Sequence, residues 1–169
     1  MLGWEIFRNF FAELRLQCEV TGYSFNESKI ASPMLPELSP PKKLLRILYA
    51  DDMRELREVA RIALSREGHL IECVGDGQQA LDRVTADPSA YDLVITDHHM
   101  PHVNGIELVT RLRGLPFGGK ILIFCSELSP VVSETYHRLN VDRILYKPVF
   151  PSELRQVLAD LFTPASCPS

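Results

Sequence analysis

Short apolar runs alternate with longer amphipathic segments along the chain from residue 42 onward. The apolar runs span residues 44–50, 70–74, 93–96, 121–125 and 144–146. Runs of this length without a regular polar alternation are typical of strands that are buried on both faces of a parallel sheet. Because a segment of helical periodicity follows each run, the pattern predicts an α/β domain with a doubly wound, five-stranded parallel sheet and right-handed crossovers.

The segments between the runs repeat their apolar residues at helical spacing. The predicted inward faces carry Met53, Leu56, Ala60 and Ala63, then Ala80, Leu81 and Val84, then Ile106, Val109 and Leu112, and finally Leu154, Val157, Leu158 and Leu161. Pro151-Ser152 is a start signal for the last of these helices. Ser129-Pro130 has the pattern of an N-cap followed by proline at the first helical position, and Asp76 is expected to cap the helix after it.

Residues 1–41 differ in character from the rest of the chain. Their large apolar residues follow a helical period and are Trp4, Phe7, Phe10, Phe11 and Leu14. This period predicts one amphipathic helix, which a proline-rich linker ending at Pro41 separates from the next segment. We interpret residues 1–41 as an extension, 42–163 as the folded domain and 164–169 as a C-terminal tail. Two interpretations of the extension stay open, a floppy tail or a docking or dimerising helix.

The composition excludes several classes of function. Hydrophobic residues make up 46% of the chain and charged residues 24%, which is typical of a folded globular protein. The net charge of −4 and the lack of a Lys/Arg-rich run argue against direct binding of nucleic acid. No apolar run approaches the roughly 20 residues of a membrane-spanning helix, and charged residues interrupt any apolar signal sequence at the N-terminus. Four cysteines without a C-x-x-C pair favour a reduced, cytoplasmic protein.

Polar side chains follow four of the five apolar runs. These runs end in Asp51-Asp52, in Asp97, in Ser126 and in Lys147-Pro148. Because open α/β sheets bind ligands beyond the carboxyl ends of their strands, we expect these side chains at one edge of the sheet. Clustered carboxylates repel one another and suit a hard cation such as Mg²⁺. A carboxylate beside a metal, a lysine and a hydroxyl can accept a phosphoryl group, so the sequence favours phosphoryl chemistry.

In order and spacing, these pieces resemble the receiver domains of two-component response regulators. The matching residues are Leu48 to Asp52, Asp92 to Asp97, Met100-Pro101, Asn104-Gly105, Ser126 and Lys147-Pro148. The resemblance covers about residues 43–162. It implies the flavodoxin-like receiver fold with strand order 2-1-3-4-5, and it puts the site between the first and third strands.

The resemblance also implies a role for each residue of the acidic group. Asp97 corresponds to the phosphoacceptor, and Asp52 to a direct Mg²⁺ ligand. Asp51 corresponds to the carboxylate that acts through water and orients the site. The backbone carbonyl of His99 would complete the protein's share of the metal ligands.

Two further residues and the partners follow from the same resemblance. Ser126 corresponds to the hydroxyl that contacts the phosphoryl group, and Lys147 to the lysine that bonds a phosphoryl oxygen, with a Lys147-Pro148 bond that is often cis. The phosphoryl donor would be a histidine kinase or a histidine phosphotransfer protein, and the downstream protein target is not implied. Such a domain assists its own phosphorylation and dephosphorylation without being a conventional enzyme. Because the chain ends soon after Phe162, we expect a stand-alone receiver, or one fused behind residues 1–41, and a homodimer stays open.

The chain departs from the family pattern at two positions. Glu127 stands where a very small residue is usual, and it is expected to crowd the site. Ile144 replaces the usual aromatic residue, and Tyr146 sits too close to Lys147 to be assumed a substitute. These departures keep open a pseudo-receiver, an interaction module that does not switch by phosphorylation.

Neither an enzyme nor a transition-metal site fits the sequence as well as a receiver domain does. A phosphatase with an aspartyl nucleophile would need a second Asp two residues beyond Asp97, where His99 stands. His98, His99 and His102 could suggest a zinc or copper site, but their spacing matches no standard pattern. The remaining histidines, His69 and His137, are expected to be ordinary turn and helix-surface residues.

Overall fold

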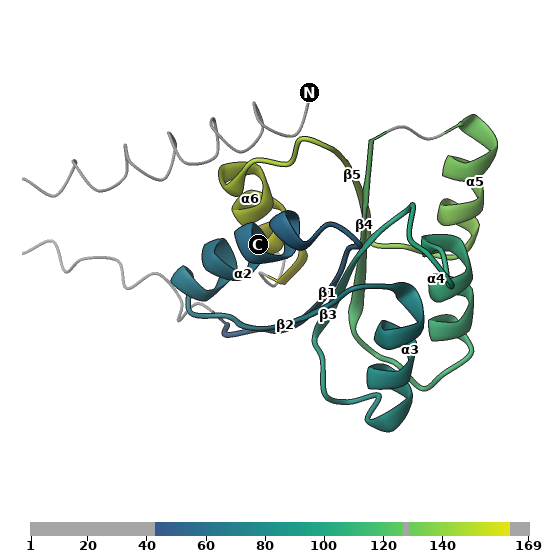
Figure 1. The fold of residues 1–169 in the computed structure, drawn as a ribbon, viewed down its shortest axis with the longest axis horizontal. Coiled ribbons are helices and arrows are strands. Elements are labelled where there is room, and N and C mark those ends of the chain that lie inside the picture. The colour runs from purple at the N-terminus through teal and green to yellow at the C-terminus, as the bar shows by residue number, and fades with distance from the viewer. Residues whose placement is uncertain (1–42, 127–128, 163–169) are drawn as a thin grey trace, which may run out of the picture. The chain divides into compact units, whose positions relative to one another are not determined.

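Five parallel strands form one sheet in the order β2-β1-β3-β4-β5, as predicted (Figure 1). The computed structural model describes residues 43–126 and 129–162. The strands are β1 (Arg46–Ala50), β2 (Leu70–Val74), β3 (Leu93–Asp97), β4 (Lys120–Cys125) and β5 (Arg143–Tyr146). The helices are α2 (Arg54–Arg66), α3 (Gly77–Ala86), α4 (Gly105–Arg113), α5 (Pro130–Arg138) and α6 (Pro151–Phe162). The strands thus lie within one or two residues of the predicted apolar runs.

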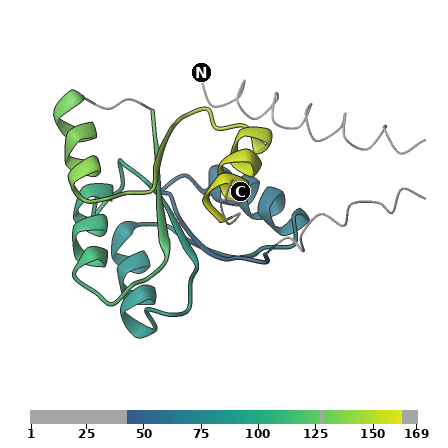
Figure 2. The same ribbon diagram turned by 180° about the vertical axis from the view of Figure 1, so that it is seen from behind.

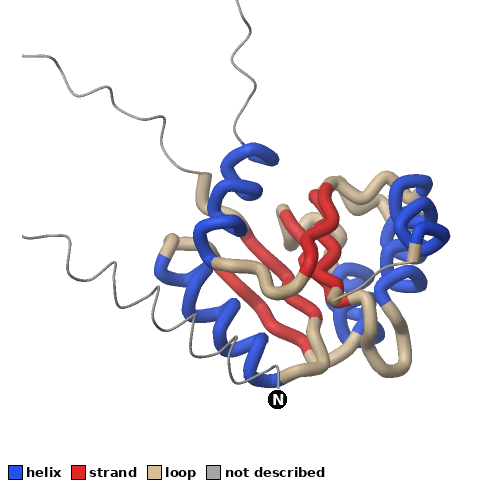
Figure 3. The backbone as a smooth tube through the Cα atoms, turned by 90° about the horizontal axis from the view of Figure 1, so that it is seen from above, coloured by secondary structure: helices blue, strands red, loops and turns tan. Residues whose placement is uncertain are grey.

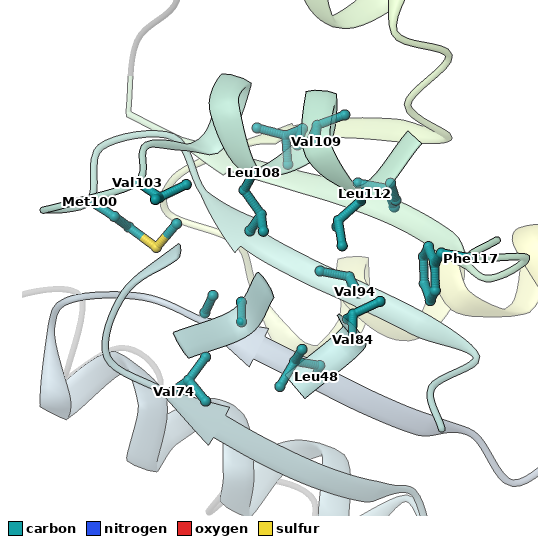
Figure 4. Packing of buried hydrophobic residues seen from close by; sticks show 14 of the residues in the cluster. Leu48, Val74, Val84, Val94, Met100, Val103, Leu108, Val109, Leu112 and Phe117 are labelled. Atoms are coloured by element: carbon teal, nitrogen blue, oxygen red, sulfur yellow. The ribbon is translucent and has the colours of Figure 1, made fainter. Parts of the chain in front are cut away.

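Helices cover both faces of the sheet (Figures 2 and 3). On one face, α2 and α6 bury Leu64, Leu154 and Leu158 against the strands. On the other face, α3, α4 and α5 form a second apolar cluster with β1, β3 and β4, part of which Figure 4 shows. Successive residues of a strand point to opposite faces, so Ile47 joins the first cluster and Leu48 the second. The fold is therefore doubly wound.

The two edge strands are less buried than predicted. All residues of β3 are buried, whereas β2 begins with Leu70 at 68% exposure and β5 ends with Tyr146 at 54%. The prediction that the five strands are largely buried on both faces is therefore wrong at these edges. The physical reason is that an edge strand is paired on one side only and the helices cover it incompletely.

The helix starts follow the sequence signals closely. The Asp76 carboxylate accepts a hydrogen bond from the backbone N–H of Gln79 at 2.8 Å and caps α3. Ser129 caps α5, with Pro130 at the first helical position. The predicted face of α2 is wrong at Met53, which precedes the helix and is 46% exposed. The buried residues of α2 are Ala60, as predicted, and Leu64.

His69 also differs from the prediction of an ordinary turn residue. It is 5% exposed, and its Nδ1 accepts a hydrogen bond from the backbone N–H of Leu45 at 3.2 Å. It follows Gly68, whose φ of 88° makes the sharp turn into β2 and brings the ring inward. His137 lies exposed on α5, as predicted.

Several predictions fall outside the described residues. These are the amphipathic helix and linker within residues 1–41, the tail 164–169 and the side chain of Glu127. No helix within residues 43–126 and 129–162 is long and apolar enough to cross a membrane.

Candidate functional site

Three aspartates meet where β1 and β3 end side by side. Asp51 directly follows β1, Asp52 comes next, and Asp97 is the last residue of β3. One carboxylate oxygen from each residue lies within 4.8 Å of the others. We call these three residues the acidic cluster. The sheet order explains the cluster, because β1 and β3 are paired neighbours although a helix, a strand and another helix separate them in the chain.

Asp51 is fully buried, and three donors bind its carboxylate. Its Oδ2 accepts hydrogen bonds from the Tyr49 hydroxyl at 2.9 Å and from Lys147 Nζ at 2.9 Å. Its Oδ1 accepts one from the backbone N–H of Met53 at 2.9 Å. Burial and the neighbouring Asp51 charge raise the pKa of Tyr49 well above its ordinary value, so the phenol stays protonated and donates. Asp51 is therefore held in a fixed orientation inside the protein.

Lys147 connects the two buried carboxylates. Its Nζ lies 2.9 Å from Asp51 Oδ2 and 3.0 Å from Asp97 Oδ1. Burial alone would lower the pKa of Lys147, but the Asp51 and Asp97 charges outweigh it and raise this pKa above the ordinary value. The Lys147-Pro148 peptide bond is cis, in agreement with the prediction.

Asp97 remains short of positive charge despite this lysine. Its burial is the largest influence and raises its pKa, Lys147 lowers it, and Asp51 raises it further. The net shift of this pKa is upward because burial, together with the Asp51 charge, outweighs the effect of Lys147, which Asp97 shares with Asp51. An oxygen-only donor set with excess negative charge and one exposed member, Asp52, fits a hard divalent cation such as Mg²⁺.

Arg57 holds the backbone of the first two aspartates. Its Nη1 donates to the carbonyl oxygen of Asp51 at 2.7 Å and to that of Asp52 at 2.9 Å. Sequence reasoning missed both Arg57 and Tyr49. The available signals were weak: a cation near the start of the following helix, and a phenol two residues before Asp51 on the same face of a strand.

The loop after Asp97 is anchored by a tyrosine of α5. His98 Nδ1 lies 2.7 Å from the hydroxyl of Tyr136, which is fully buried, and the His98 and His99 rings pack edge to face. Burial, and then His99, lower the pKa of His98. His102 instead lies 3.4 Å from the Asp76 carboxylate. His98 and His99 thus contact each other, whereas His102 lies beside Asp76.

The comparisons with known proteins agree with this arrangement. The family model of the response regulator receiver domain matches residues 47–159, which is more than half of the chain. The chain belongs to this family. The receiver domain includes the whole sheet except Arg46, and it contains all three aspartates and Lys147.

Relatives of this receiver occur in several kinds of signalling protein. Two-component response regulator ORR41 of Oryza sativa subsp. japonica is 30% identical over 120 residues, which are 70% of this chain and 94% of that protein. Sensory/regulatory protein RpfC of Xanthomonas campestris is 31% identical over 121 residues, 69% of this chain but 16% of RpfC. The matched region is therefore nearly the whole of ORR41 but only a small part of RpfC. The structure of chemotaxis protein CheY4 from Vibrio cholerae matches with a TM-score of 0.64 and 26% identity, covering 70% of this chain and 98% of that one.

The receiver's remaining predicted residues lie at the same edge of the sheet or beside it. Ser126 is exposed and directly follows β4, the neighbour of β3. Ile144 is half-buried in β5 and packs against the core, whereas Tyr146 points away from it. Glu127 lies outside the described residues, so its crowding of the site stays a prediction.

Proposed function

We propose that this receiver domain takes a phosphoryl group onto Asp97 and thereby changes its binding to a protein partner. The observation that carries the proposal is the pairing of Asp97 with Lys147 Nζ at 3.0 Å inside a cluster of three carboxylates. A lone capping aspartate would need neither the lysine nor the other two acids. Asp51, Asp52 and Asp97, with the backbone carbonyl of His99, would hold Mg²⁺, which neutralises charge on the transferring phosphoryl group.

The proposed step is a displacement at phosphorus. A carboxylate oxygen of Asp97 attacks the phosphorus atom of a phosphohistidine, so a P–O bond forms while the P–N bond breaks. The histidine nitrogen of the donor leaves with the bonding electron pair and takes up a proton. Lys147 and the Ser126 hydroxyl would donate to the phosphoryl oxygens. Water later attacks the aspartyl phosphate and releases inorganic phosphate.

The donor would be a histidine kinase or a histidine phosphotransfer protein acting in the cytoplasm. Support comes from relatives that include a protein named sensor histidine kinase AruS of Pseudomonas aeruginosa, 29% identical over 144 residues. The chain spans 14% of AruS, so the kinase reaction itself is not attributed to this chain. The downstream protein and self-association are left to experiment.

A phosphorylation assay separates this function from its alternatives. The purified chain is incubated with acetyl phosphate and Mg²⁺, with a chelator in the control, and its mass is measured over time. We expect one phosphoryl group to accumulate per chain, only when Mg²⁺ is present. A pseudo-receiver would gain none, and a phosphatase would consume acetyl phosphate continuously without a comparable accumulation. Either outcome would contradict the proposal.

A further inference from the structure

Tyr49 belongs to the hydrophobic core and to the acidic cluster at the same time. It is 3% exposed, and its ring packs edge-on against Phe124 with centroids 5.9 Å apart. Its hydroxyl nevertheless donates to Asp51 Oδ2 at 2.9 Å. The resemblance to receiver domains implies no function for this position.

The backbone gives the Tyr49 hydroxyl little freedom. β1 is paired on both sides, with Tyr49 in register with Cys73 of β2 and Ile95 of β3. Residues two apart on a strand lie on the same face, so the ring extends along the side on which Asp51 follows. The hydroxyl is thus presented to Asp51 by a rigid part of the sheet.

The two groups that donate to Asp51 Oδ2 differ in what else they bond. Tyr49 Oη bonds only this carboxylate among the contacts of the described residues, whereas Lys147 Nζ also bonds Asp97 Oδ1. The oxygens of a phosphoryl group on Asp97 would lie farther from the Asp97 backbone than the carboxylate oxygen that Lys147 bonds in this structure. Lys147 must then move outward to bond them, which weakens its contact with Asp51. Asp51 is 0% exposed, so water cannot readily replace the lost donor.

We propose that Tyr49 is a positioning residue that keeps the Asp51 carboxylate bonded and oriented when Lys147 turns to a phosphoryl group on Asp97. The inference rests on the proposed function. In a protein without this hydroxyl, Lys147 would be the one donor to Asp51 Oδ2 among the residues that the structure describes. When Lys147 turned to the phosphoryl group, this oxygen would have no donor, so the phosphorylated state would be disfavoured. Before phosphorylation, Lys147 and the Met53 N–H still hold Asp51, so Mg²⁺ binding by itself needs the hydroxyl much less.

Two matched variants test whether the Tyr49 hydroxyl supports phosphoryl binding more than it supports Mg²⁺ binding. Tyr49→Phe removes the hydroxyl and keeps the ring against Phe124. Tyr91→Phe removes another tyrosine hydroxyl that donates to a carboxylate, that of Glu72 at 2.5 Å, beside the opposite end of β3 from the acidic cluster. Calorimetric titrations measure the affinity for Mg²⁺ alone, and then for beryllium fluoride, a phosphoryl analogue, at saturating Mg²⁺. Circular dichroism checks that each variant is folded.

We expect Tyr49→Phe to weaken beryllium fluoride binding about tenfold while the Mg²⁺ affinity stays within about threefold of the parent protein. Tyr91→Phe should change neither affinity by more than about twofold. Equal weakening of both ligands in Tyr49→Phe would indicate a merely structural hydroxyl and overturn the inference, and so would unchanged binding of both. If the parent protein itself binds no beryllium fluoride, the proposed function fails and the inference fails with it.

The parent protein offers an independent measurement. In proton NMR spectra, the Tyr49 hydroxyl proton should be protected from exchange with water both without ligand and with Mg²⁺ and beryllium fluoride bound. Loss of this protected signal on adding beryllium fluoride would contradict the inference, because the hydroxyl would then have left Asp51.

Discussion

Lys147 Nζ lies 2.9 Å from Asp51 Oδ2, although 96 residues separate the two in the chain. β3 and β4 lie between their strands in the sheet, so the lysine reaches across the ends of both. The ion pair is therefore a product of the complete fold, and it links the last strand to the first.

Removing this lysine should destabilise the fold. Lys147→Met leaves two buried carboxylates without their cation, and we expect the free energy of unfolding at pH 7 to fall by about 2–4 kcal/mol. Lys120→Met is the matched control, because Lys120 Nζ pairs with Asp142 at 2.9 Å but is 43% exposed. Its loss should be below about 1 kcal/mol. Denaturant unfolding measures both, and equal losses would contradict the buried ion-pair network.

Gly105 should not tolerate even a methyl group. A Cβ there would lie 2.6 Å from the Tyr136 hydroxyl oxygen and 2.7 Å from the carbonyl oxygen of Asp97. We expect Gly105→Ala to lower the free energy of unfolding by about 1–3 kcal/mol. Gly118→Ala is the control, because nothing lies within 4 Å of its Cβ position. A Gly105→Ala variant as stable as Gly118→Ala would show that α5 does not pack against this loop as described.

Asp52 is the acid whose removal tests metal binding with the least disturbance of the fold, because it is exposed. Asp52→Ala should weaken Mg²⁺ binding at least tenfold and make the metal-free protein slightly more stable, since carboxylate repulsion is relieved. Asp160→Ala, on the exposed side of α6, is the control. Calorimetric titration compares the affinities, and an unchanged Mg²⁺ affinity in Asp52→Ala would exclude it as a ligand.

The raised pKa of Asp97 predicts a pH dependence with a definite sign. At pH values above 3.8, the ordinary pKa of an aspartate, the folded protein holds the Asp97 proton more tightly than the unfolded chain does. The stability that this group contributes therefore falls as pH rises from 3.8 through the raised pKa, and it stays lower above that pKa. Asp97→Asn removes this dependence, so its stability relative to the parent protein should improve as pH rises toward neutral. Unfolding curves at several pH values test this, and the opposite trend would contradict the assignment.

The fold and the identity of the acidic cluster could be predicted because they depend on pattern. Buried strands are apolar runs, and a parallel sheet brings the ends of its strands to one edge, so Asp51, Asp97 and Lys147 could be predicted to converge there. Capping of α3 and α5 also follows from local chemistry, as Asp76 and Ser129 show.

The contacts that orient the cluster could not be predicted in the same way. Tyr49 reads as one more apolar residue of a buried strand, yet its ring packs against Phe124 and its hydroxyl donates to Asp51. Arg57 reads as a solvent-facing helix residue, yet it bonds two carbonyl oxygens. Burial of His69 depends on the turn at Gly68 and on a backbone N–H 24 residues away. Such contacts depend on tertiary packing rather than on spacing along the chain.

The central claim is that Asp97 is the phosphoacceptor, and mapping the modified residue tests it most directly. The chain is phosphorylated with acetyl phosphate and Mg²⁺, the acyl phosphate is trapped by borohydride reduction, and the modified peptide is sequenced by mass spectrometry. We predict that the parent protein carries the modification on Asp97 and that Asp97→Asn carries none. Modification of Asp51 or Asp52 in the parent protein, or undiminished phosphorylation of Asp97→Asn, would contradict the account.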